Sequence, residues 1–547
     1  MRPQGLSTGG LDRHRELNVT SAFSTSQIIS KPATSSGGGV VAAQNRTAAA
    51  IGAAILKSGG DAVDAAVATS FALGVVEPWM SGPAGGGVMM VWREAEQKAY
   101  CVHYGMRAPA GLDPADYPLS GRGIADDLFP WKAVVDDRNV EGAKAVAVPG
   151  LVDGIGIAHE RFGRLDWAGL LQPAARLARE GFEVDWYAAL MIASTTRSLA
   201  RDPDAAAIFL DDGCWPPVPG WTEGGARRIA NPAMAETIER IAAHGHREFY
   251  DGETGRRLAA DIAAKGGSLS LADLTAYHAS LDEVALTPYR DGGFFLPTAL
   301  TAGPTFSAAF ATLARGAQAG RGGPDAASYC AYADALAAAY HTRLAEDGDN
   351  EAPHARACTT HFSVVDRAGN MVAMTQTLLS VFGARVVSPG TGLLLNNGIM
   401  WFDPEPGHPN SLGAGKRCLM NVCPVIGETA TGRFAIGASG GRKIMPAVAQ
   451  ISSFLIDHGM SLEDAFRQPR IDVSGGPVIT ADAALPQATL DALAEGRHVV
   501  AARNGVYPNS FANMSGVMRV GDTNFGASEV MSPWGDAVAE DEAVGPA

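Results

Sequence analysis

Apolar and polar positions follow two different periods along this chain. Up to about residue 345, apolar residues recur at helical spacing, which predicts helices over residues 47–57, 62–77, 170–179 and 326–344. After residue 359 they alternate with polar residues, which predicts strands over residues 361–366, 371–377 and 433–436, followed by a helix over 443–456. Helices that precede strands within one chain favour an α+β fold, in which sheets are covered by helices.

The first two predicted strands are joined by a turn signal at residues 367–370, Arg-Ala-Gly-Asn, and so form a hairpin. With four residues in the turn, Thr360 faces Thr377 and Thr359 faces Leu378, to within about one residue of register. The hairpin therefore brings the hydroxyl of Thr377 beside the Thr359–Thr360 pair. Threonine is also favoured in strands for its shape alone, which is the purely structural interpretation.

Thr359 stands at an abrupt boundary. An acidic, polar run at residues 346–353 precedes it, and the strand pattern begins at Thr359 itself. Such a boundary suggests a chain that cuts its own backbone there and exposes a threonine with a free α-amine. That amine has a reference pKa of roughly 7.7–8.0. It can therefore accept the proton of the neighbouring hydroxyl and activate it as a nucleophile.

A glycine-rich loop at residues 437–441, Gly-Ala-Ser-Gly-Gly, separates a predicted strand from a predicted helix. Consecutive glycines let backbone N–H groups point into a cavity, where they can stabilise an oxyanion. A tight strand-to-helix turn would use the same glycines without any catalytic role.

The same loop also fits G-x-S-x-G, the nucleophile elbow of α/β hydrolases. In that alternative Ser439 is the nucleophile, and Asp472 or Asp482 and then His498 follow in the required chain order. The long helical region before Ser439 argues against it, because α/β hydrolases alternate strands and helices. It also leaves the boundary at Thr359 without an explanation.

Composition limits which partners and which cellular compartment are expected for the protein. The 547 residues carry a net charge of −15 at a pI of about 5.3, which disfavours nucleic acid as a partner. The six cysteines form no CxxC pair and predict free thiols. The first residues lack a signal-peptide pattern, and no apolar run is long enough to span a membrane. We therefore expect a cytoplasmic protein without metal, cofactor or membrane, since no Walker or dinucleotide motif is present.

An ordered set of short motifs resembles the gamma-glutamyltransferase (glutathione hydrolase) family of N-terminal-nucleophile hydrolases. The set extends over residues 40 to 475, and the order of the motifs is more specific than any one of them. The motifs are Gly59-Gly60-Asp61-Ala62-Val63-Asp64-Ala65-Ala66, Glu77-Pro78 with Ser81-Gly82 and Gly85-Gly86-Gly87, Val148-Pro149-Gly150, the stretch Thr359 to Asp366, Leu395-Asn396-Asn397, Gly415-Lys416-Arg417, and the loop at 437–441.

The resemblance implies an αββα four-layer sandwich and a single-chain precursor. Residues 1–39, which end in Gly37-Gly38-Gly39, are expected to be a flexible leader. The resemblance implies a large chain over 40–358 and a small chain over 359–547, separated by self-cleavage between Cys358 and Thr359. The partners would be the two chains of one precursor, a small amide substrate, and water or an amine as acceptor; a homo-oligomer is possible. Thr359 would be the nucleophile, Thr377 its hydrogen-bond partner, and Gly440 with Gly441 the oxyanion hole.

The positions that bind the γ-glutamyl group in this family differ here. The family's carboxylate-binding Arg falls on Gly105, with Arg107 two residues on, and its Asn after the second Thr falls on Leu379. Its polar and acidic contacts to the substrate α-amine fall on Gly398 and Trp401. Its two adjacent serines fall on Met420 and Asn421.

These departures predict a Thr amidohydrolase or acyltransferase with another acyl donor. Arg107, Arg385 and Arg442 would supply positive charge for a small oxamate-like or dicarboxylic monoamide, although Arg385 and Arg442 could equally form structural ion pairs. Trp401 and its apolar neighbours would suit a bulkier acyl group, as in cephalosporin acylases, and Asn421 is a further candidate contact. A true gamma-glutamyltransferase and an inactive, unprocessed relative are the remaining alternatives.

Overall fold

The computed structural model describes residue 29 and residues 31–125, 127, 131–218, 227–298, 300–316, 322–346, 358–507 and 509–543. The side chains of 344–346 and 358 are not among the described parts. The acidic run before Thr359 lies mostly outside these ranges.

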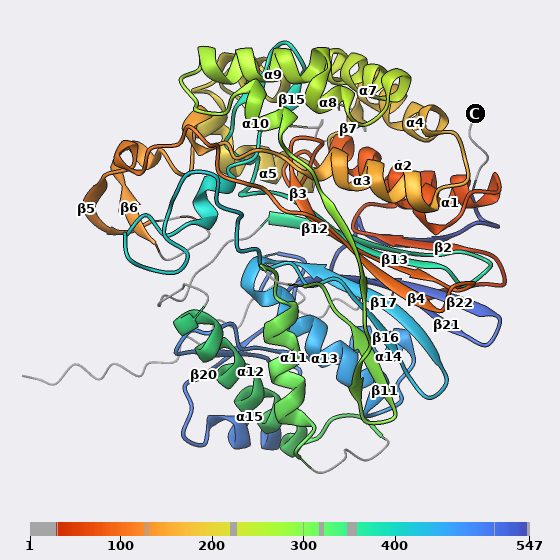
Figure 1. Ribbon diagram of the computed structural model, residues 1–547. Helices are drawn as coiled ribbons and strands as arrows, with labels where there is room; N and C mark the ends of the chain where they lie inside the picture. Colours follow the sequence, from red (N-terminus) through yellow and green to blue (C-terminus); the bar gives the residue numbers. More distant parts are fainter. Residues whose placement is uncertain are drawn as a thin grey trace, which may run out of the picture.

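Two seven-stranded antiparallel sheets form the centre of the molecule (Figure 1). In spatial order, the first sheet contains β1 (Thr34–Ser36), β22 (Thr523–Ser528), β21 (Asn513–Val520), β17 (Gly432–Ser439), β16 (Val425–Glu428), β11 (Gly292–Phe295) and β10 (Thr287–Tyr289). The second contains β23 (Asp536–Ala539), β2 (Val40–Ala43), β12 (Cys358–Val365), β13 (Met371–Leu379), β3 (Gly86–Arg93), β4 (Lys98–Tyr104) and β9 (Ser280–Val284). Each sheet therefore combines strands from both sides of residue 358.

Helices cover the outer face of each sheet (Figure 1). Above the second sheet lie α1 (Arg46–Lys57), α2 (Ala62–Val76), α3 (Leu151–Phe162), α4 (Trp167–Glu180), α5 (Trp186–Leu199), α6 (Pro203–Phe209), α7 (Pro232–His244), α8 (Glu248–Asp251), α9 (Glu253–Ala264) and α10 (Leu271–Thr275). Below the first sheet lie α11 (Gly303–Leu313), α12 (Ala326–Glu346), α13 (Ile444–Ile456), α14 (Leu462–Arg467) and α15 (Gln487–Ala494).

Shorter strands lie outside the two sheets and form three two-stranded sheets and one three-stranded sheet. They are β5 (Leu119–Ile124), β6 (Lys132–Val134), β7 (Phe182–Glu183), β8 (Arg228–Ile229), β14 (Val387–Ser388), β15 (Leu393–Leu394), β18 (Ile471–Asp472), β19 (Ile479–Asp482) and β20 (Val499–Ala502).

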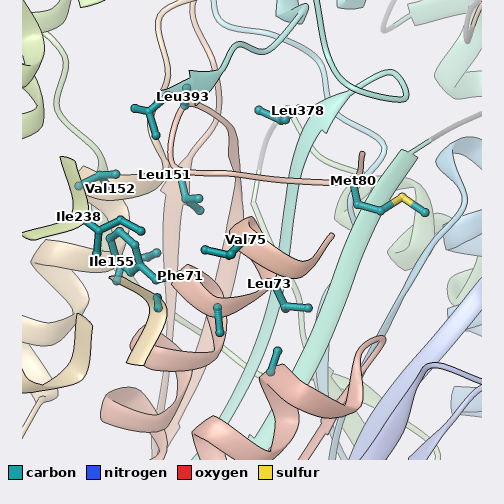
Figure 2. Close-up of a cluster of buried hydrophobic side chains, with 14 of the residues drawn as sticks. Phe71, Leu73, Val75, Met80, Leu151, Val152, Ile155, Ile238, Leu378 and Leu393 are labelled. Carbon is teal, nitrogen blue, oxygen red and sulfur yellow. The ribbon is translucent and has the colours of Figure 1, made fainter. Parts of the chain in front are cut away.

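Three apolar layers separate the four structural layers and confirm the αββα sandwich. The strands of the inner pair are buried on both faces: Val41 of β2 packs under the helices, while Val40 packs between the sheets. Figure 2 shows part of the helix-side layer, with Phe71 and Val75 of α2 near Ile155 of α3. A third cluster lies between the first sheet and the lower helices. Because buried two-sided strands admit only one register, the sandwich fixes which side chains face the space between the sheets.

The hairpin register differs by one residue from the prediction. Asp366 donates its backbone N–H to the carbonyl of Asn370, so three residues and not four form the turn. Gly369 has φ +93°, which suits this tight turn. Thr360 therefore pairs with Gln376 and not with Thr377.

The expected leader is partly structured. Residues Thr34–Ser36, assigned from the sequence to the leader, form β1 at the edge of the first sheet and pair with β22. Lys31 donates to backbone carbonyls of Glu529 and Gly535 at 3.1 and 2.6 Å. The sequence did not reveal this strand because three polar residues carry no apolar alternation. Residues 1–28 and residue 30 of the leader lie outside the described residues.

Two further properties follow from the described part of the chain. None of its helices combines the length and apolar character needed to cross a membrane. The five cysteines with described side chains are unpaired, and Cys101, Cys418 and Cys423 are buried.

His361 of β12 forms a polar contact point between the two sheets. It is fully buried, and its ring nitrogens contact the hydroxyls of Thr375 and Ser363 at 2.9 and 3.0 Å. Burial lowers the pKa of His361 to about 3, so the ring is neutral. It packs directly on Gly437 of β17, where an added Cβ would lie 2.4 Å from the ring carbon Cε1. The first glycine of the 437–441 loop thus serves sheet packing.

We expect Gly437→Ala to destabilise the protein by roughly 1–3 kcal/mol, because the methyl group overlaps a ring that has no room to move. The measurement is the melting temperature of the purified variant. Gly505→Ala is the control, since nothing lies within 4 Å of the added Cβ there. Equal melting temperatures for the two variants would contradict the packing argument.

Candidate active site

A β-bulge lies at the point where Thr377 faces Thr359. Cys358 pairs with Leu379 and Thr360 with Gln376, so two residues of β13, Thr377 and Leu378, oppose the single residue Thr359. A bulge of this kind redirects side chains and often lies next to a functional site. The hydroxyl oxygens of Thr359 and Thr377 lie 3.5 Å apart, and both residues are buried. The expected proximity of the two hydroxyls is present, although the register differs.

The hydroxyl of Thr377 is oriented by the backbone that follows it. Leu379 donates its N–H to the Thr377 oxygen at 2.8 Å, which leaves the Thr377 hydroxyl hydrogen for another acceptor. Leu379 itself has φ +89°, a conformation that bulky residues rarely adopt and that costs on the order of 1–3 kcal/mol. Strained backbone of this kind is characteristic of sites where geometry serves chemistry.

The glycine loop follows β17 directly. Gly440 has φ +137° and Gly441 has φ +60°, so both need the conformational freedom of glycine. Gly441 begins a 3-10 turn (Gly441–Lys443) that leads into α13, so the loop lies at a helix start, where backbone N–H groups lack partners within the helix. The sequence identified this loop, and the structure gives it the backbone geometry that an oxyanion-binding loop needs.

Gln44, at the end of β2, connects the nucleophile strand to this loop. Its amide nitrogen donates to the hydroxyl of Ser439 at 2.8 Å and to the carbonyl of Asn513 at 3.0 Å. Its amide oxygen lies 3.0 Å from the Ser439 hydroxyl and 3.4 Å from that of Thr360. One buried side chain therefore holds the residue after Thr359 and the residue before Gly440 at a fixed separation.

Glu77 completes this polar network on the helix side. The Thr360 hydroxyl donates to the Glu77 carboxylate at 2.9 Å, and Glu77 is almost fully buried at the end of α2. Burial raises the pKa of Glu77 to about 7, the hydrogen bond from Thr360 opposes this rise, and the charge of Asp185 adds to it. Near neutral pH the carboxyl group is thus divided between its protonated and ionised forms.

Two glycines that replace the family's polar contacts are covered by methionines. An added Cβ at Gly105 would lie 2.8 Å from the terminal methyl carbon of Met420. At Gly398 it would lie 2.7 Å from the sulfur of Met106. Both methionines are fully buried and belong to the apolar cluster between the sheets, which also contains Leu379. The space that an arginine or an acidic residue would need is therefore filled with apolar atoms.

Arg385 and Asn421 are engaged within the protein. Arg385 forms an ion pair with Asp127 at 2.9 Å and donates to the Val140 carbonyl at 3.2 Å. Asn421 accepts a hydrogen bond from Arg343 at 3.3 Å. These contacts favour structural roles over substrate binding for both residues.

Trp401 and Arg442 are buried, and Arg107 is half-buried. Trp401 ends a short 3-10 turn (Gly398–Trp401) within the apolar cluster, and its carbonyl accepts from Asn410 at 2.6 Å. Arg442 lies in the turn after the glycine loop, where its positive charge opposes the rise of the Asp472 pKa to about 6 that burial causes. Arg107 has no ion pair with any described residue.

The alternative serine triad is not assembled. The Ser439 hydroxyl contacts Gln44, whereas His498 is exposed at the start of β20. Asp472 hydrogen-bonds Ser474, and Asp482 contacts the backbone of Ala484. Without a base beside it, Ser439 has the role of a positioning side chain. No cluster of metal-binding side chains occurs among the described residues.

Sequence reasoning missed Gln44 and Glu77 as parts of the site. Glu77 lies in a motif that the sequence offered, Glu77-Pro78, but nothing in that motif indicated a contact with Thr360. Gln44 follows four apolar residues as a single polar residue, which carries no motif at all. Its position between the sheets becomes visible only in three dimensions.

We expect Glu77→Gln to remove a pH-dependent loss of stability. A carboxyl whose pKa rises on folding, here from 4.5 to about 7, stabilises the fold below pH 4.5, and this stability is lost as the pH rises through about 7. The native protein should therefore lose roughly 2 kcal/mol between pH 5 and pH 8 that the Gln variant retains. Melting temperatures of both proteins at the two pH values test this, and parallel curves would rule it out.

Comparisons with known proteins agree with this geometry. A model of the gamma-glutamyltranspeptidase family matches residues 48–358 and 345–539. The acylase ACY 1 proenzyme of Pseudomonas sp. (strain V22) is 36% identical over 510 residues, covering 86% of this chain and 88% of that protein. The glutathione hydrolase proenzyme of Pseudomonas aeruginosa is 31% identical over 487 residues, covering 79% and 82%.

The fold is shared with a solved structure. The crystal structure of cephalosporin acylase from Bacillus halodurans superposes with a TM-score of 0.80 at 23% identity and covers 96% of this chain and 99% of that one. The match to the family model over most of the length, together with the threonine pair and the glycine loop, leads to one conclusion. The chain belongs to the gamma-glutamyltranspeptidase family, and it is an enzyme of the N-terminal-nucleophile hydrolase type.

Proposed function

We propose that this enzyme is a self-processing acylase that uses Thr359 to hydrolyse an amide whose acyl group is not γ-glutamyl. The observation that carries the proposal is the apolar filling at Gly105 and Gly398 by Met420 and Met106. The similarity to an acylase proenzyme over 86% of the chain supports the same choice.

Processing begins with the hydroxyl of Thr359. Its oxygen attacks the carbonyl carbon of Cys358, the C–N bond breaks, and the acyl group moves to the oxygen as an ester while the nitrogen becomes a free α-amine. Water then hydrolyses the ester and leaves a carboxylate on Cys358 and a free hydroxyl on Thr359. The products are chains of 358 and 189 residues, which remain together because they share both sheets.

Catalysis repeats this chemistry on an external amide. The α-amine of Thr359 takes the hydroxyl proton as the oxygen attacks the substrate carbonyl. The N–H groups of Gly440 and Gly441 stabilise the negative oxygen of the tetrahedral intermediate. Thr377 holds the attacking oxygen in place through its hydroxyl. The protonated amine then passes its proton to the leaving nitrogen, and water or an amine releases the acyl group from Thr359.

The acyl-binding side lacks what a γ-glutamyl group needs. That group carries an α-ammonium and an α-carboxylate, and desolvating an ammonium without a paired acid is costly. Near Gly398 lie the side chains of Met106 and Ala147 together with the neutral amide of Asn396, and none of these is an acid. Each lost charge-assisted hydrogen bond corresponds to roughly 1.5–3 kcal/mol. An acyl group without an α-amine fits this surface better.

We expect freshly purified protein to show two chains by intact-mass measurement, and Thr359→Ala to show one. The alanine variant lacks the attacking oxygen, so the Cys358–Thr359 bond persists. Thr359→Ser keeps a hydroxyl and is the matched control, which should still be cleaved. Cleavage of the alanine variant, or an active wild-type enzyme in one uncut chain, would refute self-processing.

We expect γ-glutamyl-p-nitroanilide to be a poor substrate. Among p-nitroanilides of aliphatic acyl groups with four to six carbons, at least one should have a kcat/KM more than tenfold above that of the γ-glutamyl compound, because the pocket offers no acid to the α-amine. Release of p-nitroaniline measures this directly. Preferred turnover of the γ-glutamyl compound would instead identify a true gamma-glutamyltransferase.

A further inference from the structure

Two segments of the site lie at the same end of the first sheet. β16 and β17 are antiparallel, with Val425 opposite Ile436, so the chain just before β16 and the chain just after β17 are neighbours. The segment before β16 contains Met420 and Asn421, on the proposed acyl-binding side. The segment after β17 is the glycine loop, which continues into the turn Gly441–Lys443. One helix can therefore contact both segments.

A buried tyrosine of α12 contacts the glycine loop. The hydroxyl of Tyr340 donates to the backbone carbonyl of Arg442, which immediately follows Gly441. Tyr340 is 1% exposed, and burial raises the pKa of its phenol well above the usual value, although the charges of Arg343 and Arg442 oppose the rise. The phenol therefore stays protonated and remains a donor. It fixes the turn that follows the two glycines from the helix side.

Arg343 lies three residues further along the same face of α12 and contacts the other segment. Its Nη2 atom donates to the Met420 carbonyl at 3.1 Å and to the side-chain oxygen of Asn421 at 3.3 Å. Its Nη1 atom donates to the Thr301 carbonyl at 2.9 Å and to the Thr305 hydroxyl at 3.2 Å. A guanidinium presents its donors in a rigid fork, so the four bonds fix the parts that they join relative to one another.

The acyl-binding segment depends on this arginine for its position. Met420 and Val422 each share one backbone hydrogen bond with residues 300–302, at 2.9 and 3.1 Å. Arg343 bonds to carbonyls on both sides of this pairing. Because the thioether of Met420 covers Gly105, a shift of the segment would change the apolar surface that faces the acyl group.

Packing fixes the orientation of α12. Leu336 and Ala339 are buried in the apolar cluster below the first sheet, and Tyr329, near the start of the helix, donates to the Pro469 carbonyl at 2.5 Å. The helix therefore presents Tyr340 and Arg343 at a fixed separation. Since α12 precedes residue 358 and both segments follow it, these bonds would also join the two chains of the processed enzyme.

We propose that Tyr340 and Arg343 are positioning residues, which set the oxyanion loop and the acyl-binding segment from one face of α12. The inference rests on the proposed acylase function. Each residue acts through a backbone carbonyl, that of Arg442 or of Met420. The oxyanion loop is used fully only in the transition state, so loss of the Tyr340 bond lowers kcat for every acyl group. The other segment distinguishes acyl groups, so loss of Arg343 changes their relative kcat/KM.

The test of Tyr340 uses the two-chain enzyme and the p-nitroanilide, γ-glutamyl included, that the wild type turns over fastest. Tyr340→Phe keeps the ring and removes the hydroxyl. It should lower kcat roughly tenfold to hundredfold, while KM changes less than about threefold. Tyr329→Phe is the matched control on the same helix, because its hydroxyl bonds neither segment, and its kcat should match the wild type. Equal kcat values for the two variants overturn the role of Tyr340.

The test of Arg343 compares aliphatic acyl p-nitroanilides with four and six carbons. Arg343→Met should change the ratio of their kcat/KM values by about tenfold, and Arg343→Lys, which keeps the charge and part of the bonds, should change it less. The two-chain pattern and the melting temperature show how much of each variant is folded, and Arg343→Lys carries the test if Arg343→Met does not fold. A uniform loss of activity with an unchanged ratio makes Arg343 structural only and overturns its role.

The same experiment separates the inference from the function on which it rests. If the wild type prefers the γ-glutamyl compound, the acylase function fails, while the Tyr340 comparison still stands on that substrate. If no anilide is turned over, the acylase function also fails. The rate at which p-nitrophenyl butyrate acylates Thr359, followed by the mass of the small chain, then replaces kcat in the comparison of Tyr340→Phe with Tyr329→Phe.

Discussion

The hairpin register that sets Thr377 opposite Thr359 is the constraint on which the site depends. In the register set by the Thr360–Gln376 pair, Thr377 is the residue of β13 that comes opposite Thr359 on the same face of the sheet. The two hydroxyl oxygens lie 3.5 Å apart, and the bulge that follows adds Leu378, whose N–H donates to the Met80 carbonyl at 3.0 Å. The strained backbone of Leu379 follows at once and supplies the N–H that orients that hydroxyl. The sandwich keeps this geometry in place because the strands on both sides are buried.

The residues of the candidate catalytic site and those of the proposed acyl-binding side belong to different segments of the chain. Thr359, Thr377 and the glycine loop lie at the facing ends of β12, β13 and β17, and Gln44 contacts both Thr360 and Ser439. The segments around Gly105 and Gly398 pack beside them and consist largely of apolar side chains. A change of acyl donor therefore needs substitutions in these neighbouring segments only, while the chemistry at Thr359 stays as it is.

The sequence predicted the chemistry better than the surroundings of the site. Thr359, Thr377 and the glycine loop carry local signals, because a nucleophile at a strand boundary and a row of glycines each depend on neighbouring residues in the chain. The helix at α2 was equally predictable from its Asp61 cap, which accepts from Val63 at 2.9 Å. Contacts between residues far apart in the sequence could not be predicted. Gln44 meets Ser439 across 395 positions, and no local period encodes such a meeting.

Each sheet pairs strands from both sides of residue 358, so cleavage there would change how the unfolded enzyme can refold. In the second sheet, β2, β3, β4 and β9 precede the cut, while β12, β13 and β23 follow it, so the two products alternate within one ladder. Before the cut, the connecting segment keeps the two halves at high local concentration during folding. Afterwards, reassembly from the unfolded state is a meeting of two separate molecules and depends on dilution. Once cleaved as proposed, the enzyme would depend on its rate of unfolding more than on its ability to refold.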